Sequence, residues 1–356
     1  MNADNILISL IKGNKTPSVH YIFFDAERVI HRFKGGLADI KNKEQVSDQT
    51  SYAAFSVTKT FTALAVLQLA ENKKINLDES IKKYLPKFTY GAEISVRNLL
   101  NHTAGIPNPN PLSWIHLEEE HTSFDNKLFF DSIFIKHNKT KSKPNEKFNY
   151  SNLGYVLLGQ LIEKISGQTY ENYIRNHILK PIDIPPAKLD FEIHEGTKLA
   201  KGYQKRLSFM NLLLGFFIDK SKFMAKAEGK WKPFRKNYVN GSSYGGLMGT
   251  PDAFVKYLQE LLKPNCALLS AEFKKMLFTE KRTNDDKATG MCCSWFTGML
   301  NQEPYFTHAG GGGGYYCEVR IYTEIGMGSV IMFNRSGMRD ERFLDKLDSF
   351  FIENKK

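Results

Sequence analysis

The apolar stretch from residue 61 to residue 70 constrains this chain more than any other feature. Only Thr62 and Gln68 interrupt it, and a helix that is apolar on nearly every side is buried inside a protein. Ser56 and Lys59 stand just before it, three residues apart, so they share one helical face. A buried lysine has a lowered pKa and can take the proton of a serine hydroxyl. The pattern predicts a reactive serine and its base at the beginning of a core helix.

Spacing alone is weak evidence for catalysis, because the chain contains a second pair of the same kind. Ser80 and Lys83 also stand three residues apart. They lie in the polar sequence DESIKKYLP, which is typical of a helix face in contact with solvent. Only the apolar stretch that follows Lys59 distinguishes the first pair from the second.

The composition is that of a large folded protein with an excess of positive charge. The 356 residues are 42% hydrophobic and 24% charged, which allows one large domain or two closely joined ones. The net charge of +11 raises nucleic acid or an anionic membrane surface as partners. Lysine and arginine are spread along the chain without a nucleic-acid recognition motif, so we expect no nucleic-acid function.

Cysteine, targeting and metal signals are weak throughout the chain. Cys266, Cys292, Cys293 and Cys317 are neither dense nor spaced as metal ligands, so we expect reduced, mostly buried thiols. No zinc signature is present, and we expect neither a metal nor another cofactor. The beginning of the sequence lacks the features of a secretory signal, and no run is long enough for a transmembrane helix. These observations predict a cytoplasmic protein.

Strands are predicted at both ends of the chain and helices between them. The predicted strands are two within residues 18–40 and four at 294–300, 305–309, 315–322 and 329–334. Besides the core helix, the predicted helices cover residues 77–85, 94–101, 153–167, 169–179, 251–262 and 341–353. The last helix is expected to bury Phe343, Leu344, Leu347, Phe350 and Phe351. We expect the strands of both ends to share one antiparallel sheet.

Five segments carry a resemblance to a known superfamily. In chain order they are FSVTKTFTALAVLQL, LLNHTAGIP, NYSNLGYVLLGQLIEKISG, YGGLMGTPDAF and HAGGGGGYY. With them the chain resembles the serine β-lactamases and penicillin-binding proteins, and more narrowly the group of class C β-lactamases, D-aminopeptidases, D-alanyl-D-alanine carboxypeptidases and esterases. The resemblance covers about residues 18–351. The order of the segments makes it specific, because isolated Y-x-N and H-x-G triplets occur elsewhere in the chain.

The resemblance implies an α/β (α+β) fold of the β-lactamase and transpeptidase type. In this fold an antiparallel sheet built from N-terminal and C-terminal strands carries helices on both faces beside a helical subdomain, with the nucleophile helix between them. We therefore expect a single catalytic domain over residues 1–356. Its sheet region would cover about 15–60 and 245–356, and its mostly helical subdomain about 61–244.

The resemblance also implies a role for each matching residue. Ser56 would be the acylated nucleophile and Lys59 the amine that activates it. Tyr150, the tyrosine of a Y-x-N element, would share the proton transfer, which fits the chemistry because a nearby ammonium lowers the pKa of a phenol. Asn152 would hydrogen-bond Lys59 and a substrate amide.

His308 marks a departure from the pattern of the superfamily. His308, Ala309 and Gly310 stand where many relatives have Lys-Thr-Gly. A lysine there supplies a fixed cation for a substrate carboxylate, whereas a histidine is only partly charged at neutral pH. H-x-G occurs in the esterase and aminopeptidase branches, so the change weakens the β-lactamase interpretation. Gly310 and Gly311 would let the strand approach the substrate, and the N–H groups of Gly311 and Ser56 are the candidate oxyanion hole.

Four other patterns suggest function but have simpler interpretations. The glycines at 310–314 precede a strand and not the helix that a phosphate loop requires, so we expect a hairpin turn. Ser243, in GSSYG, lacks the strand and helix of a nucleophile elbow. His102 is expected to satisfy backbone groups. For the apolar run 209–218 and the lysines after it, we favour core or a cleft wall over a membrane contact.

Together these features predict a serine hydrolase that works through an acyl-enzyme on a small ester or a D-amino-acid amide or peptide. The expected partner is a small molecule or short peptide substrate. A true class C-like β-lactamase is the first alternative, and a catalytically silent ligand-binding or sensor protein is the second. The presence of Ser56, Lys59, Tyr150 and Asn152 together argues against the silent protein. The substrate and the oligomeric state do not follow from the sequence.

Overall fold

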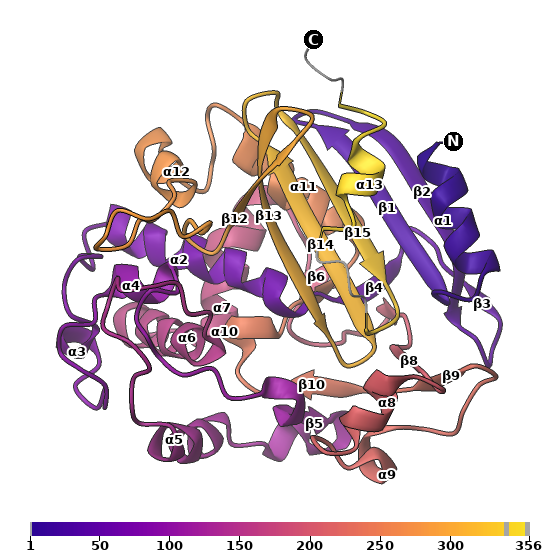
Figure 1. Cartoon of the computed structure of the whole chain (residues 1–356), viewed down its shortest axis with the longest axis horizontal. Helices are drawn as coiled ribbons and strands as arrows, with labels where there is room; N and C mark the ends of the chain where they lie inside the picture. The colour runs from indigo at the N-terminus through magenta and orange to yellow at the C-terminus, as the bar shows by residue number, and fades with distance from the viewer. Residues whose placement is uncertain (1, 338–341, 353–356) are drawn as a thin grey trace.

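A seven-stranded antiparallel sheet forms the centre of the computed structural model, which describes residues 2–337 and 342–352 (Figure 1). The strand order is β12-β13-β14-β15-β1-β2-β3. The strands are β1 Ser18–Asp25, β2 Val29–Asp39, β3 Glu44–Gln45, β12 Phe296–Leu300, β13 Glu303–Gly312, β14 Tyr315–Tyr322 and β15 Met327–Phe333. Strand β1 pairs with β15, with Val19 opposite Phe333. The prediction that both ends of the chain share one antiparallel sheet is confirmed.

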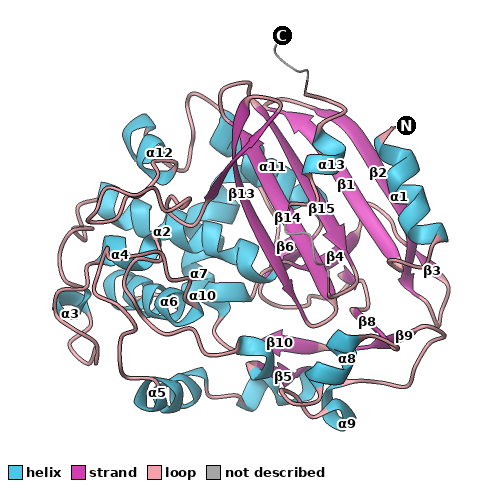
Figure 2. Cartoon of the chain, in the orientation of Figure 1, coloured by secondary structure: helices cyan, strands magenta, loops and turns pink. Residues whose placement is uncertain are grey.

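Two hydrophobic cores lie on opposite faces of this sheet. The helices that contribute to them are α1 Ala3–Lys12, α2 Thr58–Glu71, α6 Asn152–Ser166, α11 Pro251–Leu262 and α13 Asp345–Asp348. Ile22 of β1 belongs to the larger core, with α2, α6 and α11, whereas the next residue, Phe23, belongs to the smaller core, with α1 and α13. Successive side chains of a strand point to opposite faces, so helices cover the sheet on both sides (Figure 2). This is the mixed α/β fold that the resemblance implies.

Helix α2 is enclosed by protein on all sides, as its apolar sequence predicts. Every residue from Thr58 to Leu69 is buried. The two polar interruptions find partners inside the protein. The Thr62 hydroxyl lies 2.6 Å from the carbonyl oxygen of Ser243, and the Gln68 amide donates to the carbonyl oxygens of His177 and Leu268. These hydrogen bonds, together with the burial of the apolar side chains, fix the position of this helix beside the sheet.

A mostly helical region packs against α2 on the side away from the seven-stranded sheet, and the chain also forms three small sheets (Figure 1). The remaining helices are α3 Ile81–Tyr84, α4 Val96–Leu100, α5 Asn126–Lys136, α7 Tyr170–Ile174, α8 Phe209–Leu214, α9 Lys220–Phe223, α10 Ser242–Gly245 and α12 Ala271–Leu277. The remaining strands are β4 Thr50–Ala53, β5 Ile115–Leu117, β6 Leu189–Asp190, β7 Lys198–Leu199, β8 Tyr203–Lys205, β9 Trp231–Pro233, β10 Asn237–Val239 and β11 Met248–Gly249. They form the sheets β6-β11-β4-β7, β10-β5 and β8-β9.

Several elements differ from those predicted. Helices α1, α5, α8, α9, α10 and α12 are additional. The helix predicted at 77–85 is reduced to α3, because the Ser80 side chain caps it by accepting from Lys82 N–H. The last helix is reduced to α13, and its predicted ends, 341 and 353, lie outside the described residues. Phe350 is 43% exposed, so its predicted burial is wrong, because the chain continues as turns after α13.

Two further observations concern the cysteines and the possibility of a membrane-spanning helix. All four cysteines are free thiols, and all but Cys266 are buried. Within residues 2–337 and 342–352, no helix has both the length and the apolar character that a membrane crossing requires.

Candidate active site

Ser56 and Lys59 meet at the beginning of α2. Ser56 lies in the 3₁₀ turn Phe55–Val57, and Lys59 lies in the first turn of α2. The Lys59 Nζ atom is 3.0 Å from Ser56 Oγ and donates to the carbonyl oxygen of Tyr244 at 2.8 Å. Lys59 is fully buried, and burial lowers its pKa well below the ordinary value. A neutral amine has a free electron pair, so Lys59 can accept the proton of the serine hydroxyl.

Three tyrosine rings surround the Lys59 amine. Nζ lies 5.1 Å from the ring centroid of Tyr150, 5.3 Å from that of Tyr244 and 5.7 Å from that of Tyr155. Aromatic rings exclude water, which favours the neutral amine, but their faces also attract a cation. The enclosure therefore suits an amine that is neutral at rest and carries a proton briefly.

His102 holds the backbone on both sides of Tyr150. Its carbonyl oxygen accepts from Asn149 N–H at 2.7 Å, and its Nδ1 atom accepts from Ser151 N–H at 3.1 Å. Its ring lies 4.3 Å from the Tyr150 ring, centroid to centroid. Burial and the nearby Lys59 hold the pKa of His102 well below its usual range. The expectation that His102 satisfies backbone groups is confirmed, and those groups are the neighbours of Tyr150.

Asn152 begins α6 with its side chain buried near Ser56. Its backbone N–H and its Nδ2 atom both donate to Asn108 Oδ1, each at 3.0 Å. Its Oδ1 atom has no hydrogen-bond partner among the described residues. The predicted hydrogen bond between Asn152 and Lys59 is therefore not formed, because Asn108 orients the amide and Lys59 uses the carbonyl of Tyr244 instead. The unpaired oxygen is available to a substrate N–H.

His308 lies on β13 and is fully buried. Its Nδ1–H donates to the carbonyl oxygen of Ser294, which fixes the tautomer and leaves Nε2 as an acceptor. Nε2 has no partner within the described part of the chain. Burial, with a smaller contribution from Lys59, lowers the pKa of His308 to about 3. A histidine with this pKa is neutral at physiological pH and does not replace the lysine of Lys-Thr-Gly as a cation.

Gly310 lets β13 lie directly against the turn that carries Ser56. A Cβ atom at Gly310 would stand 2.1 Å from the carbonyl oxygen of Ala54 and 2.8 Å from Ser56 N. A Cβ atom at Gly311 would meet nothing closer than 3.6 Å. Gly311 lines the same cavity as Ser56. Glycine at 310 thus lets β13 bring the backbone of Gly311 close to Ser56.

The cavity beside Ser56 is small and has an apolar cover. Its volume is about 60 Å³, roughly the share of two water molecules in the liquid. We call its apolar cover the apolar roof, which consists of Leu112, Ile115, Leu214, Ile218 and Phe234. The prediction that the 209–218 run forms a cleft wall is confirmed for Leu214 and Ile218.

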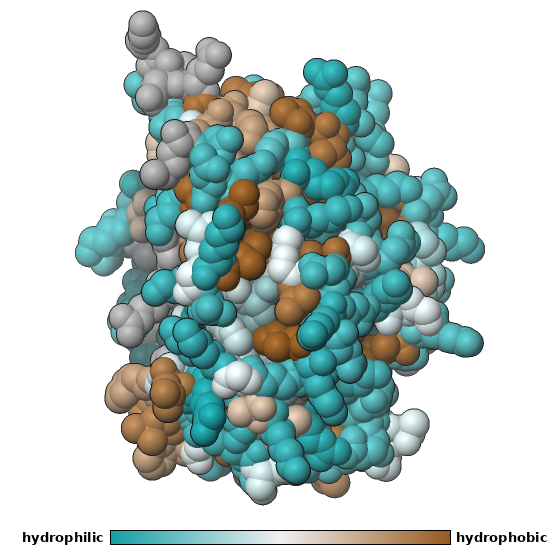
Figure 3. All heavy atoms as spheres, turned by 90° about the vertical axis from the view of Figure 1, so that its right-hand side faces the viewer, coloured by the Kyte–Doolittle hydropathy of each residue, from teal (hydrophilic) through white to brown (hydrophobic). Residues whose placement is uncertain are grey.

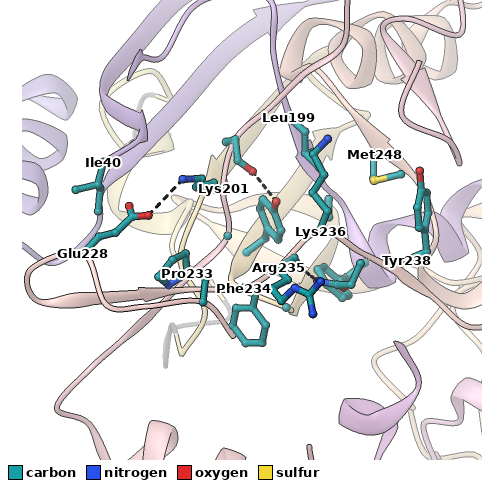
Figure 4. A pocket seen from close by; sticks show the side chains of 18 of the residues that line it. Ile40, Leu199, Lys201, Glu228, Pro233, Phe234, Arg235, Lys236, Tyr238 and Met248 are labelled. Atoms are coloured by element: carbon teal, nitrogen blue, oxygen red, sulfur yellow. Dashed lines mark hydrogen bonds and ion pairs between the residues drawn. The ribbon is translucent and has the colours of Figure 1, made fainter. Parts of the chain in front are cut away.

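A larger pocket of about 760 Å³ adjoins this cavity (Figure 4). Phe55, Phe234, Val239, Gly245 and Gly313 line both spaces. Much of the wall is apolar, and the figure shows a Lys201–Glu228 ion pair at one side. Phe55, which lines both spaces, has a backbone φ of 44°, a conformation that is rare for a bulky residue. Strain of this kind next to a reactive residue is common at functional sites.

The other sequence patterns have structural roles. Lys83 is exposed and pairs with Glu79, so the Ser80–Lys83 pair lies on the surface, as predicted. The Ser243 hydroxyl is buried and donates to the carbonyl oxygen of Tyr155 at 2.9 Å. The glycine run 310–314 forms the hairpin between β13 and β14.

One group of side chains has the spacing of a metal site among the described residues. Ligand atoms of His20, Asp48 and Asp252 lie within 4.8 Å of one another. Arg32 pairs with both carboxylates, at 3.1 and 2.5 Å, and Lys34 pairs with Asp48 at 2.5 Å. These cations balance the carboxylate charges, so the group forms an ion-pair network.

Sequence reasoning missed four contributors to the site: Phe55, Asn108, Tyr244 and Ser294. Asn108 belongs to a loop rich in asparagine and proline, in which the sequence singled out no individual site residue. Tyr244 and Ser294 act through backbone carbonyls, and every residue has one, so no side-chain pattern could single them out. Phe55 directly precedes Ser56, and only its backbone angle reveals the strain.

Comparison with known proteins places this arrangement among related folds. The sequence profile of the family described as "Beta-lactamase" matches residues 3–349. Penicillin-binding protein 4* of Bacillus subtilis is 30% identical over 298 residues, which are 81% of this chain and 61% of that protein. Protein flp of Staphylococcus aureus is 34% identical over 174 residues, which are 48% of this chain and 34% of that protein. The chain thus spans between about a third and three fifths of these relatives.

Solved structures show the same fold at low sequence identity. A class C beta-lactamase superposes with a TM-score of 0.76 and 17% identity, covering 99% of this chain and 96% of the other. D-amino acid amidase from Ochrobactrum anthropi SV3 superposes with a TM-score of 0.74 and 20% identity, covering 96% and 93%.

Proposed function

This chain belongs to the beta-lactamase family of the serine hydrolase superfamily, and on that premise we propose that it hydrolyses uncharged esters or D-amino-acid amides through an acyl-enzyme on Ser56. The observation that carries the proposal is the contact of 3.0 Å between Ser56 Oγ and a fully buried Lys59 amine. Burial lowers the pKa of this amine, which favours the neutral form that can take the serine proton.

The proposed reaction uses groups that lie around the small cavity. Lys59 takes the proton of Ser56 as Oγ attacks the substrate carbonyl, and the N–H groups of Ser56 and Gly311 bind the oxyanion. When the intermediate collapses, Tyr150 and Lys59 return a proton to the leaving alcohol or amine. Water then attacks the acyl-enzyme, with the same groups moving its proton, and releases the acid and free Ser56. The Oδ1 atom of Asn152 accepts from a substrate amide N–H.

The charge of the site favours a substrate that has no carboxylate at this point of the cleft. His308 is neutral at pH 7, because its pKa is about 3. A β-lactam or a D-alanyl-D-alanine peptide carries a carboxylate that needs a fixed cation at this point of the cleft. The adjoining pocket of about 760 Å³ offers apolar walls to an acyl group or an amino-acid side chain. The fold shared with a D-amino acid amidase supports the inclusion of D-amino-acid amides.

The test is a substrate panel on wild type and Ser56→Ala. The panel contains p-nitrophenyl esters of increasing acyl length, D-amino-acid and L-amino-acid amides, and the β-lactam nitrocefin. We expect turnover of esters or D-amino-acid amides by wild type and none by Ser56→Ala, with a fluorophosphonate adduct on Ser56 in the intact mass. Fast turnover of nitrocefin alone would favour the β-lactamase alternative. Thermal stabilisation by a ligand without turnover or adduct would favour a silent binding protein.

A further inference from the structure

The segment around α8 has one face toward the active site and another toward solvent. On the inner face, Leu214 and Ile218 are buried in the apolar roof above Ser56. The outer face consists of Leu207, Phe209, Leu212, Phe216 and Phe217, with exposed fractions of 87%, 67%, 66%, 80% and 42%. We call these five residues the apolar face. Apolar side chains gather near the lower edge of Figure 3, at the height that α8 has in Figure 1.

So many large apolar side chains close together are rare on the surface of a soluble monomer. Scattered exposed apolar residues are ordinary, but here five lie within eleven residues of the sequence. Their inner neighbours already fill the roof, so a closing movement toward the cavity would not bury the apolar face. An external partner is therefore needed to cover it.

The charge around the apolar face identifies the chemistry of that partner. Residues 203–236 contain nine lysine or arginine residues and two acidic residues. Three of the cations pair with the acidic residues 118–120 of the neighbouring turn. Six others form no ion pair within the described residues: Lys205, Arg206, Lys220, Lys226, Lys230 and Lys232. A partner with an anionic surface and an apolar interior matches this combination of exposed apolar side chains and unpaired cations.

An anionic lipid surface has both properties. Apolar side chains enter the boundary between headgroups and acyl chains, while lysine and arginine bind the anionic headgroups. A second copy of the chain is a poorer match, because two apolar faces in contact would bring two basic segments together. The charge thus separates a membrane from a symmetric dimer.

We propose that the apolar face docks on an anionic membrane surface, with Phe209, Leu212 and Phe216 inserted at the headgroup level. The Ser56 cavity lies directly under the same segment, so docking would place the apolar roof at the membrane interface. This proposal departs from the sequence-based preference for core or a cleft wall over a membrane contact, because Leu214 and Ile218 are buried whereas the outer face is exposed. Membrane binding does not depend on Ser56, so it can be tested apart from hydrolysis.

The experiment measures co-sedimentation with lipid vesicles. Wild type is compared with the double variant Phe209→Ser and Phe216→Ser. The matched control is Leu128→Ser and Ile135→Ser on α5, where the side chains are 68% and 73% exposed. Vesicles are either pure phosphatidylcholine or contain about 30% phosphatidylglycerol, at low and high salt. Circular dichroism verifies the fold of each variant.

We expect wild type and the α5 control to sediment with the anionic vesicles and to be released by salt. We expect the double variant to bind at least about tenfold more weakly, and pure phosphatidylcholine to bind wild type less than the anionic vesicles. Absence of wild-type binding, or equal binding of the double variant, would overturn the proposal. So would a wild-type dimer that the double variant converts to a monomer in sedimentation velocity, because the apolar face would then belong to an interface between copies.

Discussion

Replacement of Gly310 by alanine tests how closely β13 must approach the nucleophile. The added Cβ would stand 2.1 Å from the carbonyl oxygen of Ala54, whereas real contacts of a Cβ are essentially never under 3.0 Å. The strand and the turn must therefore separate by at least about 0.9 Å, the difference between these distances. The two atoms that the Cβ would clash with, Ala54 O and Ser56 N, belong to the backbone, so no side-chain rotation relieves the clash. A displacement of about 1 Å in a catalytic group costs roughly 10²-fold in rate.

Loss of one oxyanion donor costs roughly 10²- to 10³-fold, or about 3–4 kcal/mol. We therefore expect Gly310→Ala to slow modification of Ser56 by a fluorophosphonate about 10²- to 10³-fold, with the same loss in kcat/KM on any substrate found. The fold should survive, because overpacking of this kind costs about 1–3 kcal/mol. Intact mass against time gives the labelling rate and needs no known substrate.

The matched control is Gly311→Ala on the same strand. Its Cβ meets nothing closer than 3.6 Å, and the substitution keeps the backbone N–H. We expect labelling within a few-fold of wild type. Equal labelling by Gly310→Ala and wild type, with both folded by circular dichroism, would refute the argument that this glycine holds the donor in place.

Three further predictions address the proton-transfer groups. Lys59→Met removes the proposed base and should lower the rate of Ser56 labelling by more than about 10²-fold. Thermal stability should not fall, because an apolar side chain replaces a buried amine. A small effect on labelling would exclude Lys59 as the base. His308 stays neutral between pH 5 and 8 because its pKa is about 3, so the pH profile should contain no step that His308→Gln removes. In the unfolded chain His308 takes up a proton near pH 6.5, whereas in the folded protein it does so only near pH 3. Protonation therefore favours the unfolded chain as the pH falls from 6.5 toward 3, and wild type should lose more unfolding free energy than His308→Gln in urea unfolding. His102→Ala removes the acceptor for Ser151 N–H, so it should lower the unfolding free energy by about 1–3 kcal/mol. It should also slow the labelling of Ser56. Unchanged labelling would show that Tyr150 keeps its place without His102.

Local sequence patterns were sufficient wherever short-range geometry decides the outcome. The helical repeat makes Ser56 and Lys59 neighbours whatever surrounds them. Thr250 and Pro251 begin α11 as predicted, because the threonine side chain caps the helix by accepting from Ala253 N–H and proline suits its first turn. The strands pair as predicted, because their alternating side chains need a core on each face. The helix ends and the 196–240 segment were less predictable, since long-range packing and not local pattern determines them.

The chemistry of the site depends on segments that are distant in the sequence. Tyr244 lies 185 residues from Lys59 and accepts its hydrogen bond, and His308 lies 6.5 Å from the Tyr150 ring, centroid to centroid, only because of its place on β13. The lowered pKa values of Lys59 and His308 follow from burial, because removal from water penalises a charge, and burial is a property of the packed fold. The two faces of α8 also depend on the packed fold. The sequence shows that the helix is apolar. The elements against which it packs determine which side covers Ser56 and which side is left to solvent.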